Sequence, residues 1–185
     1  MDKKTIITFN ELWKNHPTLA DNELPCRTNG KVNFLNQCSI KLGVCLSRCG
    51  VNTSNMPGIT HCGYHPKSQG HVIRAEELAN SLTQYPIAGI QKVEKVEPKA
   101  FKDKLAGRTG IIFFKDYWQR EINGKKEEFR NRSGDHIDLW NGSRLTDWFS
   151  WVRIHIRIGN FSIYSISNNL SDLEEAKSIW FWRVL

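Results

Sequence analysis

The chain has no apolar run long enough to cross a membrane, no internal repeat and no low-complexity tract. Residues 1–9 have a basic start, but they lack the apolar core and the small-residue cleavage site of a signal peptide. We therefore expect a protein that is made in the cytoplasm. If it leaves the cell, we expect a route that needs no signal peptide.

Cysteine is sparse, and its count is odd. The five cysteines are Cys26, Cys38, Cys45, Cys49 and Cys62. An odd count leaves at least one thiol unpaired even in an oxidising compartment. If Cys38 is that thiol, the other four form up to two disulfides, or none in the cytosol, and the sequence leaves the pairing open.

The chain also lacks a Cys-x-x-Cys pair, which is typical of structural zinc sites. A group of candidate ligands nevertheless lies between residues 61 and 71: His61, Cys62, His65 and His71. Zinc ligation by some of these residues together with Cys45 or Cys49 is the alternative that we weigh. The spacing favours a protein without a metal and without a cofactor.

Apolar residues are plentiful enough for one sizeable core. Of the 185 residues, 39% are apolar, and seven tryptophans and nine phenylalanines favour a packed globule over a disordered tail. The formal net charge of +7 suits a polyanionic partner, such as nucleic acid, an anionic membrane or an anionic cell-wall polymer. Most basic residues are scattered, so the charge serves solubility equally well and decides nothing alone.

The hydrophobic pattern changes from helical to strand-like after Gly110. Before it, we expect helices at residues 10–17, 37–49, 74–84 and 98–105, and an irregular segment at 51–71. After it, we expect strands at residues 109–118, 134–140, 151–158, 161–167 and 179–185, and a short helix opened by a capping box at Ser171. Helices followed by an antiparallel sheet are α+β organisation. We interpret 1–185 as one domain, with a helical part at 1–108 and a sheet part at 109–185.

Cap and turn residues mark the limits of several elements. We expect Asn10 to cap the first helix, Asn36 to cap the second and Gly50 to end the second. Two Asn-Gly pairs predict hairpin turns, and for Asn141-Gly142 we expect a two-residue type I′ turn. One pair is Asn123-Gly124, inside a charged and protruding stretch at 119–133, and the other is Asn141-Gly142.

Cys38 is the candidate nucleophile. It lies in the first turn of the helix that Asn36 caps, and the dipole and free N–H groups of a helix N-terminus lower a thiol pKa and can bind an oxyanion. Cys45 and Cys49 lie deeper in the same apolar helix and are interpreted as small core residues. Taken alone, Cys38 is better explained as another buried core thiol.

A histidine in a later strand changes that balance. If Asn141-Gly142 forms the turn, His136 lies directly opposite Asp147, with Cβ atoms about 4.5–5.5 Å apart. A carboxylate in that place fixes the tautomer of the imidazole and stabilises the imidazolium. Asp138 shares the same strand face and is the second candidate. The sequence thus predicts a triad of Cys38, His136 and Asp147.

A resemblance to a known family is carried by four segments: NQCSIKLGV at 36–44, GIIFFKDYW at 110–118, GDHIDLWNG at 134–142 and IWFW at 179–182. With these segments in this order, the chain resembles the type VI secretion amidase effectors of the fourth class. They are papain-like relatives of the NlpC-type peptidoglycan peptidases. The resemblance spans roughly residues 10–185 and implies a papain-like, NlpC-type cysteine peptidase fold, with N-terminal helices packed on a C-terminal antiparallel sheet.

The resemblance also implies a function. Members of this family are antibacterial toxins that a type VI secretion system injects into the periplasm of a neighbouring bacterium. There they cut the bond between D-glutamate and meso-diaminopimelate in the peptide stems of peptidoglycan. By position, Cys38 corresponds to the nucleophile, His136 to the general base and Asp147 to the orienting aspartate. The implied partners are peptidoglycan, the delivery components of the secretion system and a cognate immunity protein that blocks the active site.

Two other classes of function are weighed against an enzyme. A nucleic-acid-binding module fits the net charge and the aromatic content, but no RNA-recognition, helix-turn-helix or zinc-finger pattern is present. A catalytically inactive interaction protein on the same fold would keep Cys38 only as a structural residue. The joint presence of Cys38, His136 and Asp147 argues against that alternative.

Overall fold

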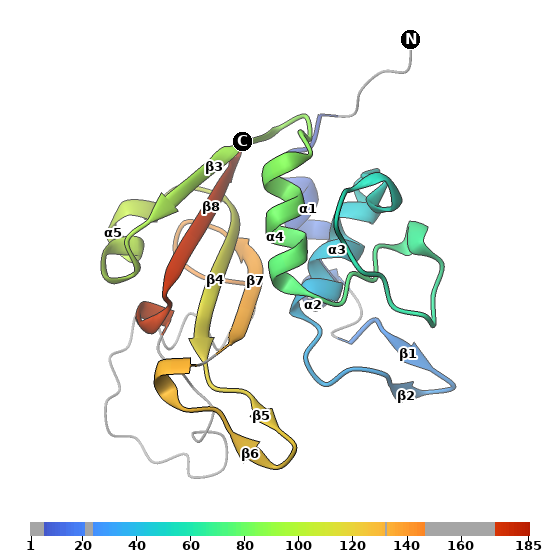
Figure 1. Ribbon diagram of the computed structural model, residues 1–185. Coiled ribbons are helices and arrows are strands. Elements are labelled where there is room, and N and C mark those ends of the chain that lie inside the picture. Colours follow the sequence, from blue (N-terminus) through green and yellow to red (C-terminus); the bar gives the residue numbers. More distant parts are fainter. Residues whose placement is uncertain (1–5, 21–23, 132, 147–172) are drawn as a thin grey trace.

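An antiparallel four-stranded sheet with helices on its faces forms the body of the protein (Figure 1). The computed structural model describes residues 6–20, 24–131, 133–146 and 173–185. The sheet has the order β3-β8-β4-β7, and these strands are Ile90–Val96, Ser178–Val184, Gly110–Trp118 and Gly134–Trp140. Each neighbouring pair is antiparallel. The predicted α+β fold, with N-terminal helices and a C-terminal antiparallel sheet, is confirmed.

The remaining elements are short. The helices are α1 (Phe9–Asn15), α2 (Pro17–Ala20), α3 (Cys38–Arg48), α4 (Ala75–Gln84) and α5 (Phe101–Leu105). Two small hairpins are made by β1 (Arg27–Thr28) with β2 (Lys31–Val32) and by β5 (Glu121–Ile122) with β6 (Lys125–Lys126). Single 3-10 turns occupy Thr53–Asn55, Lys67–Gln69, Pro98–Ala100, Phe129–Asn131 and Leu173–Glu175.

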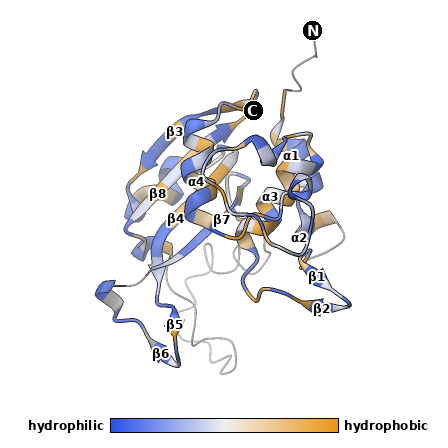
Figure 2. Ribbon diagram, turned by 45° about the vertical axis from the view of Figure 1, so that its right-hand side comes forward, coloured by the Kyte–Doolittle hydropathy of each residue, from blue (hydrophilic) through white to orange (hydrophobic). Residues whose placement is uncertain are grey.

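Alternate residues of β4 belong to two separate cores. Ile111 and Phe113 pack with the buried residues of α1, α3 and α4, whereas Ile112 and Phe114 pack with those of α5. Because successive side chains of a strand point to opposite faces, a strand covered on both sides must be apolar throughout. That is why 109–118 is recognisable from sequence. Figure 2 shows hydrophobic colouring where α3 and β7 meet and mainly hydrophilic colouring on the β5–β6 hairpin.

Helix α3 is the central helix of the larger core. Its buried residues include Ile40, Leu42 and Leu46, and they cover much of its circumference, as the pattern predicted. Gly50 follows the helix with a φ of 86°, and its N–H donates to the Ser47 carbonyl at 2.9 Å. A glycine in this left-handed conformation at C′ ends a helix without a Cβ clash, so the predicted stop is confirmed.

Two expectations for the N-terminal part are wrong. The cap of α1 is Thr8 rather than Asn10, because the Thr8 side chain and Glu11 form a reciprocal capping box. Strand β3 was missed within the part predicted to be helical. It lies at the edge of the sheet, where only one neighbour covers it, and most of its residues are exposed or half-buried. Such an edge strand needs few apolar side chains, so its pattern is weak.

The two Asn-Gly pairs behave differently. Asn123 and Gly124 have φ values of 52° and 75° between the paired residues of β5 and β6, which confirms the predicted hairpin turn and is typical of type I′. At the second pair only Gly142 has a positive φ, of 95°. The Asn141 side-chain oxygen instead accepts hydrogen bonds from the N–H groups of Ser143 at 3.0 Å and Arg144 at 2.9 Å. These bonds from the Asn141 side chain to the following backbone form an Asx turn, so the type I′ turn predicted at Asn141-Gly142 is wrong.

The predicted strands at 151–158 and 161–167 and the capping box at Ser171 lie outside the described residues. Within the described ranges, no helix is both long and apolar enough to span a bilayer.

Candidate active site

The nucleophile candidate stands at the first residue of α3. The N-cap of α3 is Gln37, so the prediction that Asn36 caps this helix is wrong by one residue. The Asn36 side-chain oxygen nevertheless accepts a hydrogen bond from the Cys38 N–H at 3.2 Å and so satisfies a free helix N–H. Gln37, at the N-cap position, turns its side chain away to the backbone of Cys26 and Phe34. The Cys38 side chain is half-buried, which leaves its thiol within reach of the surface.

Cys38 of α3 and His136 of β7 interact closely enough for each to shift the pKa of the other. Burial raises the pKa of the Cys38 thiol, but the interaction with His136 and its charge, together with the N–H groups of Ile137 and Ser39, outweigh it. The pKa of Cys38 is therefore lowered. Burial lowers the pKa of His136, yet its interactions with the Asp138 carboxylate and with Cys38 raise it well above its ordinary value. Both shifts favour a thiolate beside an imidazolium, which is the reactive form of a cysteine nucleophile.

Asp138 is the described carboxylate beside the histidine ring. One of its oxygens lies 3.7 Å from His136 Nε2, and the side chain is almost fully buried. It accepts hydrogen bonds from the Thr146 hydroxyl at 2.7 Å, the Thr146 N–H at 3.2 Å and the Leu139 N–H at 2.7 Å. Burial raises the pKa of Asp138, but His136, His16 and Thr146 together lower it. Asp138 is thus an ionised group held rigidly behind the imidazole.

Asp147, which the sequence placed opposite His136, lies outside the described residues. The register on which that placement rested is wrong in its described part. A turn made by Asn141-Gly142 requires Ser143 opposite Trp140, whereas Trp140 pairs with Leu145 and the Asn141 N–H donates to the Arg144 carbonyl at 3.0 Å. The turn residues are Gly142 and Ser143, because the Asn141 side-chain oxygen accepts hydrogen bonds from the N–H groups of Ser143 and Arg144 and so fixes the turn one residue later.

His16 is a site residue that the sequence analysis missed. It follows α1, is 2% exposed, and its Nε2 lies 3.6 Å from Asp138. Burial lowers the pKa of His16 to about 4 against the opposing charge of Asp138, so the ring is neutral at pH 7. Its Nδ1 has no hydrogen-bond partner among the described residues. In the sequence, His16 is notable only for its position between a predicted helix and Pro17. That position does not distinguish a site residue from an ordinary loop residue.

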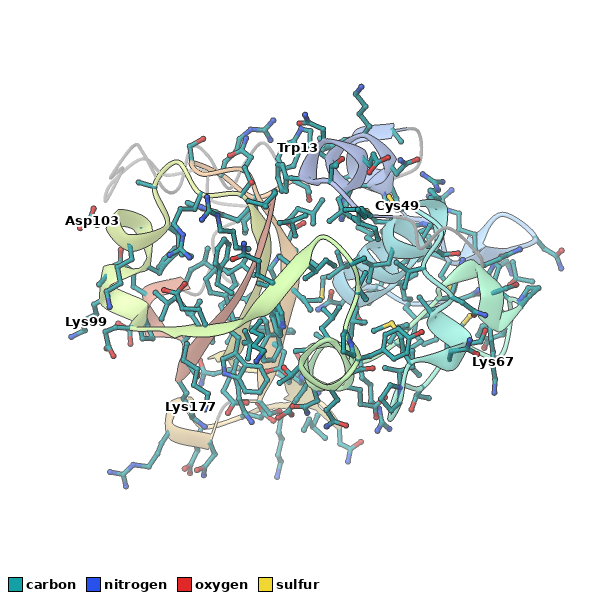
Figure 3. All side chains as sticks on the ribbon, turned by 90° about the horizontal axis from the view of Figure 1, so that it is seen from above. Trp13, Cys49, Lys67, Lys99, Asp103 and Lys177 are labelled. Carbon is teal, nitrogen blue, oxygen red and sulfur yellow. The ribbon has the colours of Figure 1, made fainter. Side chains whose placement is uncertain are left out.

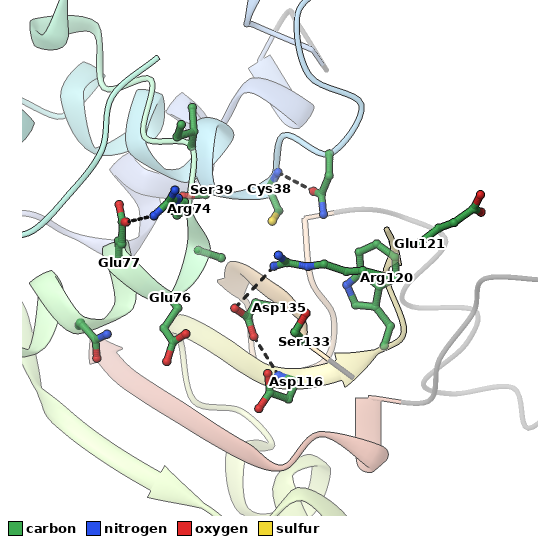
Figure 4. Close-up of a pocket in the computed structure, with 15 residues that line it drawn as sticks. Cys38, Ser39, Arg74, Glu76, Glu77, Asp116, Arg120, Glu121, Ser133 and Asp135 are labelled. Atoms are coloured by element: carbon green, nitrogen blue, oxygen red, sulfur yellow. Dashed lines mark hydrogen bonds and ion pairs between the residues drawn. The ribbon is translucent and has the colours of Figure 1, made fainter. Parts of the chain in front are cut away.

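Two hollows meet at Cys38. One, of about 720 Å³, is lined by charged residues of α4 and of the β4–β7 region, and Figure 4 shows Asp135 and Arg120 across it from Cys38. The other, of about 700 Å³, is lined by His16, His136 and Asp138 and by the segment around Leu35. Asn36, Cys38 and Trp118 line both. The thiol therefore stands where an extended chain lying across both hollows would pass.

Candidate metal ligands lie apart from this site. Cys26, Cys62, His65 and His71 bring one ligand atom each to within 4.8 Å of one another, and no other such group occurs among the described residues. Cys45 and Cys49, which we had weighed as zinc partners, are elsewhere: the Cys45 thiol donates to the Leu12 carbonyl at 3.1 Å.

A thiol on a helix N-terminus, paired with an imidazole from an antiparallel strand, is the arrangement of a papain-like cysteine hydrolase. Comparison with protein families agrees with this class. Residues 34–182 match the model of the family described as "Type VI secretion system (T6SS), amidase effector protein 4", or Tae4. The chain belongs to the Tae4 family of type VI secretion amidase effectors, which are toxins that hydrolyse peptidoglycan.

Solved structures show the same fold. The Tae4 effector of Enterobacter cloacae is similar with a TM-score of 0.58 and 15% identity, over 99% of this chain and 99% of that chain. Tae4 of Salmonella typhimurium, crystallised with the immunity protein Tai4 of E. cloacae, has a TM-score of 0.53 and 18% identity, over 96% of this chain and 98% of that chain. A comparison with curated protein sequences gives no significant match.

Proposed function

We propose that this protein is a cysteine amidase that cuts the bond between D-glutamate and meso-diaminopimelate in peptidoglycan stems. Cys38 is the nucleophile and His136 the general base and acid. The observation that carries the proposal is the Cys38–His136 pair, with its lowered thiol pKa and raised imidazole pKa, at the junction of two hollows.

The chemistry is acyl transfer through a thioester. The Cys38 thiolate attacks the amide carbonyl carbon, and the carbon–nitrogen bond breaks while the His136 imidazolium gives its proton to the leaving amine. The neutral His136 then takes a proton from water, whose oxygen attacks the thioester carbonyl. The carboxylic acid leaves, and the thiolate beside the imidazolium is restored.

The mixed charges of the larger hollow support a substrate with both ammonium and carboxylate groups. Asp135 lies 4.0 Å from Arg120 and accepts from the Asp116 N–H at 2.9 Å (Figure 4). Glu76 of α4, which pairs with Lys115, also lines this hollow. A stem peptide carries free carboxylates and, at its diamino acid, an amine. Opposite charges side by side can bind both ends of such a residue.

We further propose delivery into the periplasm of target bacteria by a type VI system, and protection of the producer by a cognate immunity protein over the active site. The Salmonella relative crystallised with Tai4 supports an immunity partner for this chain as well. The +7 net charge suits an anionic murein as the target surface.

The proposal is tested with purified sacculi. Wild-type protein should release peptides that begin with meso-diaminopimelate and should leave a new D-glutamate carboxyl terminus on the glycan-linked fragment, and mass spectrometry of the digested sacculi should detect both products. Cys38→Ala and His136→Ala should lower the rate by about 10²–10⁴-fold or more, because nucleophile and general base are lost, and circular dichroism should show an intact fold. Cys49→Ser, on the same helix, is the matched control and should keep full activity. A muropeptide profile unchanged by wild type refutes the proposal.

A second comparison concerns the carboxylate that orients His136. We propose Asp147 for this role by its place in the family pattern, and Asp138 as the buried charge that stabilises the imidazolium. Thr146, which hydrogen bonds to Asp138, brings the chain to the site immediately before Asp147. Asp147→Asn should then lower kcat with little effect on stability, whereas Asp138→Asn should lower both. If Asp147→Asn keeps full activity, the orienting role passes to Asp138.

A further inference from the structure

A buried cluster of thiols and imidazoles lies on the other side of Gln37 from the active site. Cys26 Sγ is 3.8 Å from Cys62 Sγ and 3.7 Å from His65 Nδ1, and Cys62 Sγ is 3.4 Å from His65 Nδ1. A ring nitrogen of His71 completes the group within 4.8 Å of the others. Cys26 is fully buried, and Cys62 and His71 are 5% exposed.

These separations match a tetrahedral zinc site. Zinc bonds of about 2.3 Å to sulfur and 2.0–2.1 Å to nitrogen place two sulfur ligands about 3.8 Å apart and a sulfur and a nitrogen about 3.6 Å apart. A disulfide bond between Cys26 and Cys62 would need a sulfur–sulfur distance of about 2.05 Å, far below the 3.8 Å present. The cluster has the donor set Cys2His2, which is common in structural zinc sites.

A second observation is the orphaned nitrogen of His71. Its Nδ1 is buried and has no hydrogen-bond partner among the described residues, and the His71 ring stacks on that of His65 with centroids 3.9 Å apart. A buried polar atom without a partner has lost its hydrogen bonds to water and gains no protein hydrogen bond to replace them. A cation bound through this nitrogen would supply that compensation and hold the two stacked rings in place.

The surroundings are those of a prepared site. Ile40, Val44, Phe34 and Ile73 pack around Cys26 and Cys62 and exclude water. The Asn33 amide donates to Cys26 Sγ at 3.5 Å, a contact that stabilises a thiolate. The Cys62 N–H donates to the His71 carbonyl at 2.9 Å and so closes the loop that carries three of the four ligands.

We infer that Cys26, Cys62, His65 and His71 bind a structural zinc ion. All four ligands come from the protein, so no coordination position is left for a substrate, and the ion is structural rather than catalytic. Each cysteine binds as a thiolate and releases its proton on metal binding. The sequence does contain a signal, Cys62-x2-His65-x5-His71, whose histidine spacing falls in the zinc range, but the fourth ligand is 36 residues away in Cys26.

The site connects two loops to the beginning of α3. Gln37 accepts a hydrogen bond from the Cys26 N–H at 2.8 Å and donates to the Cys26 carbonyl at 3.2 Å. Gln37 immediately precedes Cys38, so an ion bound by Cys26 would hold in place the backbone that leads into the nucleophile. Figure 3 shows Lys67, which lies in the ligand loop, at the helical end of the molecule, far from Lys99 and Asp103.

The inference is tested on protein without a polyhistidine tag, purified without chelator. Elemental analysis should give about one zinc per chain. Exchange with Co²⁺ should give the visible bands of a tetrahedral site together with sulfur-to-cobalt charge transfer. Cys26→Ser and Cys62→Ser should lose the zinc and the charge-transfer band, while His65→Cys, which keeps four ligands, should retain the metal with a stronger band.

Two variants serve as matched controls. Cys49→Ser and His61→Gln change a cysteine and a histidine outside the cluster and should keep full zinc. If the ligand variants fail to fold, the wild type decides alone: a chelator should lower its unfolding temperature, and added Zn²⁺ should restore it. The inference is overturned if the wild type holds no stoichiometric zinc and no cobalt, if peptide mapping finds a Cys26–Cys62 disulfide, or if the controls lose zinc as completely as Cys26→Ser.

Discussion

The crossing of α3 over the loop at residue 70 gives a sharp prediction for Gly43→Ala. Gly43 and Gly70 meet backbone to backbone, and a Cβ on Gly43 would lie 2.1 Å from the Gly70 carbonyl oxygen and 3.2 Å from Val72 Cγ2. In a free helix, alanine in place of glycine stabilises by about 0.5–1 kcal/mol. Here the nearest atom belongs to backbone and cannot rotate away, so overpacking of about 1–3 kcal/mol or more opposes that gain.

We therefore expect Gly43→Ala to destabilise the protein by about 1–2 kcal/mol, once the overpacking is set against the gain in helix propensity. For a chain of this length, that lowers the unfolding temperature by about 2–4 °C per kcal/mol. The free energy of unfolding is measured in urea at pH 7. Because Cys38 is the first residue of α3, the rate of Cys38 alkylation serves as a second readout of helix displacement.

Two glycines provide the controls. Gly70→Ala meets the same contact from the other side, with a Cβ 2.1 Å from the Gly43 carbonyl oxygen, and its φ of 78° adds strain. Gly58 has a φ of 69° but open space around it, so Gly58→Ala reports the strain alone, about 1–2 kcal/mol. The order of destabilisation should place Gly70→Ala above Gly58→Ala. An unchanged or higher stability of Gly43→Ala would refute the close approach of the two backbones.

Two further predictions concern titration. Iodoacetamide should alkylate Cys38 well below the pH at which free cysteine reacts. His136→Gln should slow this alkylation at pH 6.5 by about tenfold or more, because it raises the Cys38 pKa again. Peptide mass spectrometry should find the alkylation rate of Cys49 unchanged by the substitution, and equal slowing of both thiols contradicts the pairing of Cys38 with His136. The pKa of His16 is about 4 in the folded protein and 6.5 ordinarily, so between pH 4 and pH 6.5 the unfolded chain binds a proton at His16 and the folded chain does not. Stability is therefore lost as pH falls from 6.5 to 4, by roughly 3 kcal/mol for this residue, and His16→Gln should show a shallower acid loss than wild type in urea unfolding; parallel curves for the two proteins would contradict the assignment.

Local signals in the sequence predicted the elements whose causes are local. Gly50 ends α3 because glycine alone accepts its backbone conformation easily, and the first half of β4, residues 110–114, is apolar because both of its faces are covered there. The Asn123-Gly124 turn formed as predicted, since both residues have positive φ there. The positions of Cys38 and His136, on the helix and strand expected for them, followed from the same local patterns.

Tertiary structure decided what depends on distant partners. The Asn141-Gly142 pair has the same residue types as Asn123-Gly124, but its turn also meets a distant segment, since the Gly107 N–H donates to the Gly142 carbonyl at 3.0 Å, and the strand pairing beyond it is shifted. Strand β3 exists because β8 pairs with it, not because its own residues are apolar. His16 reaches Asp138 only through packing. The same holds for the metal ligands: Cys26 meets Cys62 and the two histidines because Gln37 and the loop at 62–71 bring them together, and no spacing along the chain encodes that contact.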